Sequence, residues 1–227
     1  MARAQIRTPA IVLRRTNYGE ADRILQLLTP EQGKVSVMSR GVRREKSKLA
    51  GGIELFATCD VTIMPGKGDI GTLTGARLNT FFARILKNYD RMQLGYEVIK
   101  QVSRATEMVS EPAFYELMET MYASLDDESI DIRLSEAWFW LQLAILQGAG
   151  LNLSTDANGM KLVEGTAYEY DGAESVFVYK QNGRFTTDHI KLLRLLSVQA
   201  PRIAAHVSGI DELLNDCLWL ARQASAH

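Results

Sequence analysis

The first 80 residues contain five short segments of β-type pattern and no segment with a helical period. The five segments are residues 10–15, 24–29, 34–40, 53–64 and 71–79. Stretches rich in glycine, proline and asparagine separate them, and these residue types supply turn geometry. Five strands without an intervening long helix favour a small closed barrel, because closure removes the exposed strand edges of an open sheet.

After residue 80 the apolar residues take the spacing of α-helices. The predicted helices cover residues 91–109, 114–125, 132–147, 190–198 and 210–221. Residues 151–185 interrupt this pattern, because two alternating runs flank the dipeptide Asp171-Gly172 and predict a β-hairpin. We therefore expect an α+β protein with a barrel domain at residues 1–80 and a helical domain at residues 81–227.

The formal net charge of −1 conceals a division of charge along the chain. Residues 1–80 contain 13 Lys and Arg against 7 Asp and Glu, a net charge of +6. Residues 81–227 contain 13 Lys and Arg against 20 Asp and Glu, a net charge of −7. This asymmetry predicts that the first part of the chain faces a polyanion.

The most basic run of the chain is residues 34–48, where six of fifteen residues are basic and only Glu45 is acidic. The second half of this run is predicted to be a loop, because the third strand ends near residue 40. Arg offers forked donors to phosphate oxygens and Lys a point charge on a flexible stem. The candidate nucleic-acid-binding residues are Lys34, Arg40, Arg43, Arg44, Lys46 and Lys48. A solvated loop that keeps the barrel in solution is the alternative interpretation.

A second group of candidates lies on the first two strands and on the turns. These candidates are Arg14, Arg23, Lys67 and Tyr18. Successive strand residues point to opposite faces, so Arg14 and Arg15 cannot both line one groove. At least one of them is expected to be a surface or pairing residue, with Glu20 or Asp22 as the candidate partner. Tyr18 is the candidate for base stacking, since the other aromatic residue before residue 80, Phe56, fits a barrel core. Binding is therefore expected to depend on phosphates, with little sequence preference.

The sequence does not favour an enzyme. His189, His206 and His227 have no second ligand at metal-binding spacing, and the P-loop, nucleophile-elbow and dinucleotide-binding motifs are absent. Cys59 and Cys217 lie among apolar neighbours and are interpreted as buried core residues. We expect no catalytic residue, no metal and no cofactor, and the lack of a membrane or export segment predicts a cytoplasmic protein.

Five motifs follow one another in the first 80 residues. They are AIVLRR at 10–15, YGEADRI at 18–24, GKVSV at 33–37, SRGVRREKSKL at 39–49 and GDIGTLT at 68–74. This ordered series resembles the opening of the RecO family of bacterial recombination mediators. The resemblance implies an OB-fold barrel, a helical domain and a zinc-ribbon-like insertion at residues 151–185. Many relatives carry two Cys-x-x-Cys pairs there, whereas this insertion contains no Cys and cannot form a thiolate zinc site.

The resemblance also implies a function in DNA repair and homologous recombination. Family members bind and anneal single- and double-stranded DNA and help to load RecA together with RecR. They also bind the acidic tail of the single-stranded-DNA-binding protein on the helical domain. Candidate partner-binding residues for that tail are Lys87, Arg91, Lys100 and Arg104. An OB-fold RNA-binding or ribosome-associated adaptor and an interaction scaffold remain alternatives.

Overall fold

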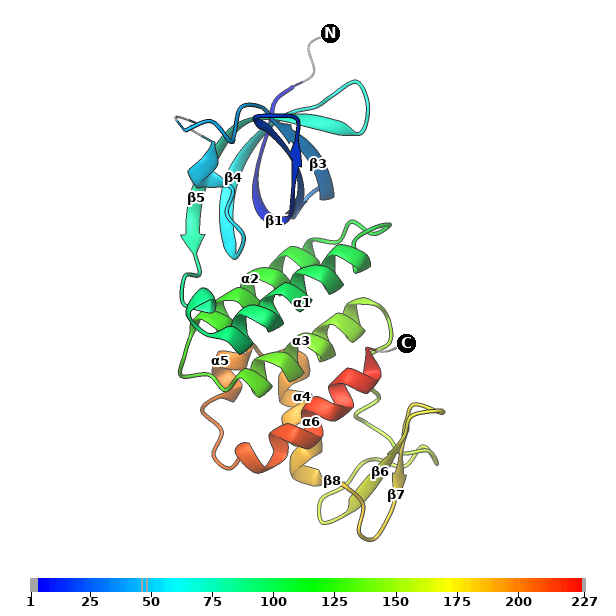
Figure 1. Ribbon diagram of the computed structural model, residues 1–227. Helices are drawn as coiled ribbons and strands as arrows, with labels where there is room; N and C mark the ends of the chain where they lie inside the picture. The colour runs from blue at the N-terminus through cyan, green and yellow to red at the C-terminus, as the bar shows by residue number, and fades with distance from the viewer. Residues whose placement is uncertain (1–3, 46, 48, 226–227) are drawn as a thin grey trace. The chain divides into compact units, whose positions relative to one another are not determined.

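Five strands at the start of the chain form a closed barrel, which confirms the predicted architecture (Figure 1). The computed structural model describes residues 4–45, 47 and 49–225. The strands are β1 (Ile6–Tyr18), β2 (Asp22–Thr29), β3 (Gly33–Ser39), β4 (Ala57–Met64) and β5 (Ile70–Phe81). Their order around the barrel is β1-β2-β3-β5-β4, with β3 and β5 parallel and the other pairs antiparallel. This is an OB-fold barrel.

Apolar side chains fill the inside of the barrel. The buried members of this core are Ala10, Val12, Leu25, Leu27, Val37, Val42, Ile53, Cys59, Val61, Ile63 and Leu73. Most of them alternate along their strands with more exposed residues, as expected when one face of a strand is buried. The charged residues of the strands and turns consequently lie on the outside of the barrel and at its ends.

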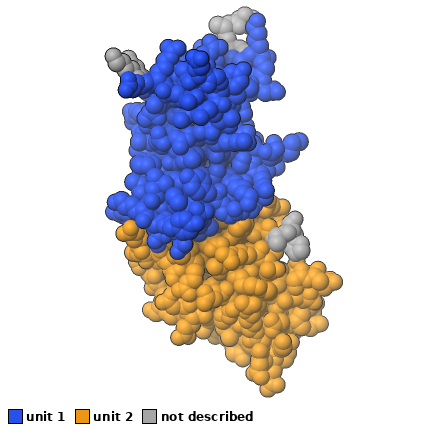
Figure 2. Space-filling model, in the orientation of Figure 1, with its two compact units in different colours: residues 1–126 blue, residues 127–227 orange. Residues whose placement is uncertain are grey.

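Two helices belong to the same compact unit as the barrel. The units are residues 1–126 and 127–227 (Figure 2), and the first contains α1 (Tyr89–Ala105) and α2 (Pro112–Asp126). Phe56 connects barrel and helices, because its ring packs edge-on against Tyr96 and Tyr122, with centroid distances of 5.0 and 5.7 Å. Phe56 is thus buried as predicted, but against helical tyrosines. The first unit is larger than the predicted barrel domain, whose boundary at residue 80 stays a prediction.

Two residues of α1 allow the helix to pack closely within this unit. A Cβ on Gly95 would lie 2.6 Å from Cε1 of Phe56, so glycine lets the helix approach that ring. The buried guanidinium of Arg91 donates hydrogen bonds to the carbonyl oxygens of Leu125 (2.9 Å) and Ser124 (3.4 Å), at the end of α2. Arg91 therefore has a structural role, and its prediction as a partner-binding surface residue is wrong.

The second unit contains four helices and a small sheet. The helices are α3 (Ile132–Leu146), α4 (Thr187–Val198), α5 (Pro201–Ala204) and α6 (Asp211–Ala224). The sheet has the order β7-β6-β8, from β6 (Ala167–Asp171), β7 (Val176–Tyr179) and β8 (Phe185–Thr186). The predicted hairpin is confirmed as β6 and β7, whereas the two-residue β8 and the four-residue α5 are too short to show a period. No helix within the described ranges is long and apolar enough to cross a membrane.

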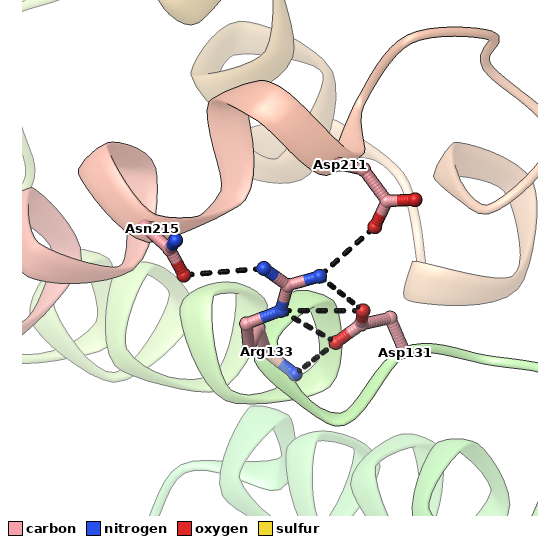
Figure 3. A network of polar contacts seen from close by, with 4 residues as sticks. All are labelled: Asp131, Arg133, Asp211 and Asn215. Carbon is pink, nitrogen blue, oxygen red and sulfur yellow. Dashed lines mark hydrogen bonds and ion pairs between the residues drawn. The ribbon is translucent and has the colours of Figure 1, made fainter.

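Arg133 joins α3 to α6 in this unit (Figure 3). Its Nη2 atom donates hydrogen bonds to the carboxylates of Asp131 at 2.6 Å and of Asp211 at 2.9 Å. Asp131 is also the N-cap residue of α3. Its Nη1 atom donates to Oδ1 of Asn215 at 3.2 Å. One guanidinium thus holds the first turns of both helices together.

An aromatic cluster stabilises the three-stranded sheet. The ring of Phe177 is fully buried and lies 5.3 Å from that of Tyr170 and 5.8 Å from that of Phe185. The guanidinium of Arg184 lies 4.3 Å above the ring of Trp219 on α6, which ties the sheet to that helix. Among the described residues no group of three His, Cys, Asp or Glu side chains could hold a metal ion. The residues of this insertion therefore do not fit the zinc that the family resemblance implies.

Because apolar packing holds this sheet, we expect an excess of EDTA to leave the thermal unfolding midpoint unchanged. Replacing Phe177 by Ala should instead lower the free energy of unfolding by about 3–5 kcal/mol, as for a large buried aromatic residue. Calorimetry with and without chelator measures both effects. A midpoint that falls on chelation and is restored by zinc would contradict this account.

Gly95→Ala tests the contact between the barrel and α1. Inside an ordinary helix this change adds about 1 kcal/mol of stability. Here the new methyl group would overlap the Phe56 ring, and we expect a loss of about 1–3 kcal/mol. Urea unfolding measures the difference, with Gly51→Ala as the control, since a Cβ there would meet no described atom within 4 Å. Equal or greater stability of the Gly95 variant would show that α1 and Phe56 are not in close contact.

Candidate nucleic-acid interface

The β1–β2 hairpin and the loop after β3 lie together at one end of the barrel. The strand register places them there: Tyr18 pairs with Asp22 at the tip of the hairpin, and Arg23 pairs with Ser39, the last residue of β3. The chain leaves β3 beside this tip, so the basic residues from Arg40 onward start next to the hairpin.

Three hydrogen bonds hold this loop against the hairpin. The carboxylate of Asp22 accepts a hydrogen bond from the backbone N–H of Gly41 at 2.7 Å. The backbone N–H of Arg43 donates to the carbonyl of Ala21 at 2.9 Å, and its guanidinium donates to the carbonyl of Gly19 at 3.3 Å. Gly41 has a φ of +63°, a left-handed conformation that glycine adopts without strain. The loop is therefore held in place through Arg43.

These contacts gather one aromatic and four basic side chains, which we call the rim surface. Its members are Tyr18, Arg23, Arg40, Arg43 and Arg44. Tyr18 is 56% exposed, and the three arginines of the loop are exposed. Arg23 is half-buried, and its Nε atom donates to Oδ1 of Asn17 at 3.1 Å. The predicted contacts Lys46 and Lys48 lie outside the described residues.

Two other predicted DNA contacts lie on different parts of the barrel. Arg14 is exposed on β1, opposite Gln26 of β2. Its neighbour Arg15 forms an ion pair with Glu54 at 2.8 Å, so one of the two arginines is a pairing residue, although its partner is neither Glu20 nor Asp22. Lys67 is exposed on the turn before β5, a strand that begins opposite Ser36 of β3.

Lys34 does not belong to the rim surface. Its side chain is only 13% exposed, and its ammonium group donates to the carbonyl of Ser103 and to Glu107, both at 2.8 Å. The hydrogen bond from Lys34 also lowers the pKa of the Glu107 carboxyl. Lys34 therefore holds β3 against α1, and its prediction as a DNA contact is corrected.

The predicted partner-binding residues lie on two helical elements and differ in burial. Arg91 is buried, and Lys87 lies on the short 3-10 helix η2 (Ile85–Lys87) that precedes α1. Lys100 and Arg104 lie one turn apart on α1, where the Lys100 ammonium pairs with Glu97 at 3.0 Å. An acidic peptide would meet this carboxylate beside the two cations.

The two cysteines are buried, as predicted. Burial, together with the neighbouring charge of Asp60, raises the pKa of the Cys59 thiol to about 12. Burial and the charge of Asp216 raise the pKa of the Cys217 thiol to about 12 as well. Both thiols are protonated at neutral pH and do not supply the thiolate that nucleophilic attack or metal binding requires.

The residues that position the loop, Asp22 and Gly41, were not predicted as site residues. They are 19 positions apart in the sequence, and neither could contact a phosphate favourably through its side chain. A signal was present, since Gly41 follows a predicted strand directly and an acidic residue lies in the preceding hairpin. Such a pair becomes informative only when the strand register is known.

Residues 1–82 match the family model described as Recombination protein O N terminal. The chain is 33% identical over 164 residues to the DNA repair protein RecO of Dehalococcoides mccartyi strain 195, an alignment that covers 71% of this chain and 64% of the relative. It is 30% identical over 145 residues to the DNA repair protein RecO of Rubrobacter xylanophilus, over 64% of this chain and 58% of the relative.

The matched region spans less than two thirds of the length of these relatives. The family-model match, residues 1–82, includes the whole barrel, in the strand order of an OB fold. The match of residues 1–82 and the similarity to named RecO proteins agree with the motifs of the first 80 residues, and residues 1–82 are a RecO N-terminal domain.

Proposed function

We propose that this protein is a DNA repair and recombination mediator that binds DNA through phosphates at the rim surface. The observation that carries the proposal is the docking of an arginine-bearing loop on the β1–β2 hairpin, through Gly41 and Arg43. Arginines held on a fixed support lose less conformational entropy on binding phosphate than arginines on a free loop.

The local balance of charge supports binding of a polyanion. The rim surface contains four arginines, and the acidic residues nearest in sequence are Glu20, Asp22 and Glu45. The Asp22 carboxylate is already hydrogen-bonded to the loop backbone. The loop sequence continues with Lys46 and Lys48, which add two positive charges. Guanidinium groups on the outside of a barrel reach the phosphates of single and double strands alike and carry little sequence information.

Such a surface can assist strand annealing. Each phosphate that is neutralised reduces the repulsion between two complementary strands, so a bound strand pairs more readily with a second one. The similarity to RecO proteins supports the wider role, in which RecR and the acidic tail of the single-stranded-DNA-binding protein are partners and RecA is loaded as the outcome. The rim surface contributes DNA binding to that role and requires no catalytic residue.

Replacing Arg43 and Arg44 by Ala should weaken binding to DNA of any sequence. With four to six phosphates neutralised, the plot of log K against log salt concentration should have a slope of roughly −3 to −5 for the wild type. The double variant should reduce the magnitude of this slope by about 1–2. Fluorescence anisotropy at several salt concentrations measures both quantities.

The control for this variant is Arg202→Ala, an exposed arginine on α5 in the second unit. It should leave the affinity and the slope unchanged. An unchanged affinity of the Arg43/Arg44 variant would refute the rim surface as the DNA site. Much tighter binding of RNA than of single-stranded DNA of the same length would favour the RNA-binding alternative.

Two variants of Asp22 separate the charge of this residue from its contact with the loop. Asp22→Asn and Asp22→Ala remove the same negative charge, but only the Asn side chain can still accept the hydrogen bond from Gly41. We expect Asp22→Ala to bind DNA several-fold more weakly than Asp22→Asn, because the loss of one such bond costs about 1–2 kcal/mol of loop order. Equal affinities of the two variants would show that docking of the loop does not matter for binding.

A further inference from the structure

The basic part of the sequence continues beyond the barrel. Residues 77–104 contain six Lys and Arg against two Asp and Glu, a net charge of +4. Residues 105–227 contain 8 Lys and Arg against 18 Asp and Glu, a net charge of −10. The change of sign thus falls at the end of α1, and the first helix shares the charge of the barrel.

Three aromatic rings are exposed in this basic stretch. Phe81 ends β5 and is 42% exposed, Tyr89 begins α1 and is 70% exposed, and Tyr96 is 43% exposed. Tyr89 and Tyr96 are seven residues apart, about two helical turns, and therefore lie on the same face of α1. Phe81 lies eight residues before Tyr89 in the same stretch of chain, so the three rings are candidates for one shared binding surface.

The rings rest on a rigid support within the first unit. The backbone N–H of Phe82 donates to the carbonyl of Phe56 at 3.0 Å, and the ring of Tyr96 packs against Phe56. The ring of Phe82 lies 5.6 Å from that of Tyr122. The backbone N–H of Arg84 donates to the carboxylate of Asp126 at 2.7 Å. Binding would therefore require little ordering of this part of the chain.

Exposed cations lie among the rings along the chain. Arg77 precedes Phe81, and Arg84 and Lys87 lie between Phe81 and Tyr89. The acidic residues of this region are Asp60, which lies opposite Arg77 in the register of β4 and β5, Asp90 in the first turn of α1, and Glu97. The Glu97 side chain is 36% exposed beside Tyr96, and its carboxylate forms an ion pair with Lys100. Rings that stack on unpaired bases, with cations that contact the backbone between them, are the two elements that single-strand binding proteins combine.

We propose that this region is a second DNA-binding surface, which holds a single strand by stacking its bases. We call it the stacking surface, and its members are Arg77, Phe81, Arg84, Lys87, Tyr89 and Tyr96. The proposal rests on the proposed function and deepens it, because the rim surface contacts phosphates and accepts duplexes, whereas the stacking surface requires unpaired bases. A molecule with both surfaces can hold one unpaired strand near another strand or duplex.

The test compares a dT oligonucleotide with an abasic oligonucleotide of the same length. Stacking should make the wild type bind the dT strand about tenfold more tightly than the abasic strand. The double variant Phe81→Ser with Tyr89→Ser should lose this preference and keep its affinity for duplex DNA. Tyr89→Ser alone should lose part of the preference for dT. This single variant keeps the test valid if the change at Phe81 disturbs β5. Tyr179→Ser, an exposed tyrosine on β7, is the matched control and should keep the preference.

The outcomes distinguish this proposal from the proposed function. If the double variant keeps the full preference, the stacking surface is refuted. If, in addition, the Arg43/Arg44 variant binds both oligonucleotides more weakly than the wild type, the proposed function stands without the stacking surface.

Three further outcomes are informative. A preference for dT over the abasic strand that disappears only in Tyr18→Ser would place base stacking at the rim surface and also refute the proposal. If the double variant instead loses affinity for an acidic peptide and keeps the base preference, the surface binds protein. A wild type that binds neither oligonucleotide at low salt would refute both.

Discussion

Closure of the five-stranded barrel is the constraint on which the other features depend. Because the interior is filled by apolar side chains, each charged residue of the strands lies on the outside or at an end. The register of β2 with β3 then brings the end of β3 beside the β1–β2 hairpin. The basic loop consequently starts beside Asp22, whose carboxylate accepts a hydrogen bond from the loop backbone.

The carboxylate of Asp22 has a structural role that the charge distribution along the chain does not indicate. Asp22 places a negative charge beside the proposed DNA-binding surface, where it would weaken long-range attraction of a polyanion. Its hydrogen bond to Gly41, however, fixes the loop that carries Arg43. A charged hydrogen bond contributes about 1.5–3 kcal/mol, more than one screened surface repulsion costs. Arg91 likewise uses its charged group for a structural contact, because this buried cation joins two helices through hydrogen bonds.

The sequence predicted the barrel, the long helices and the hairpin, because alternation and helical period are properties of single segments. It did not predict the roles of Lys34 and Arg91, since their partners Glu107 and Leu125 are far away in the chain and become neighbours only through tertiary packing. Phe56 was predicted to be buried, but its contacts depend on a positive φ of 55° and on Gly95 of α1. The aromatic cluster around Phe177 likewise required the position of α6.

Hydrogen–deuterium exchange of the full chain, with and without single-stranded DNA, tests the central claim most directly. A surface built from the hairpin tip and the docked loop should show slower exchange on DNA binding in residues 17–23 and 39–45. The account predicts little change in the acidic second unit, residues 127–225. Protection confined to that unit, with the hairpin and the loop unaffected, would contradict it.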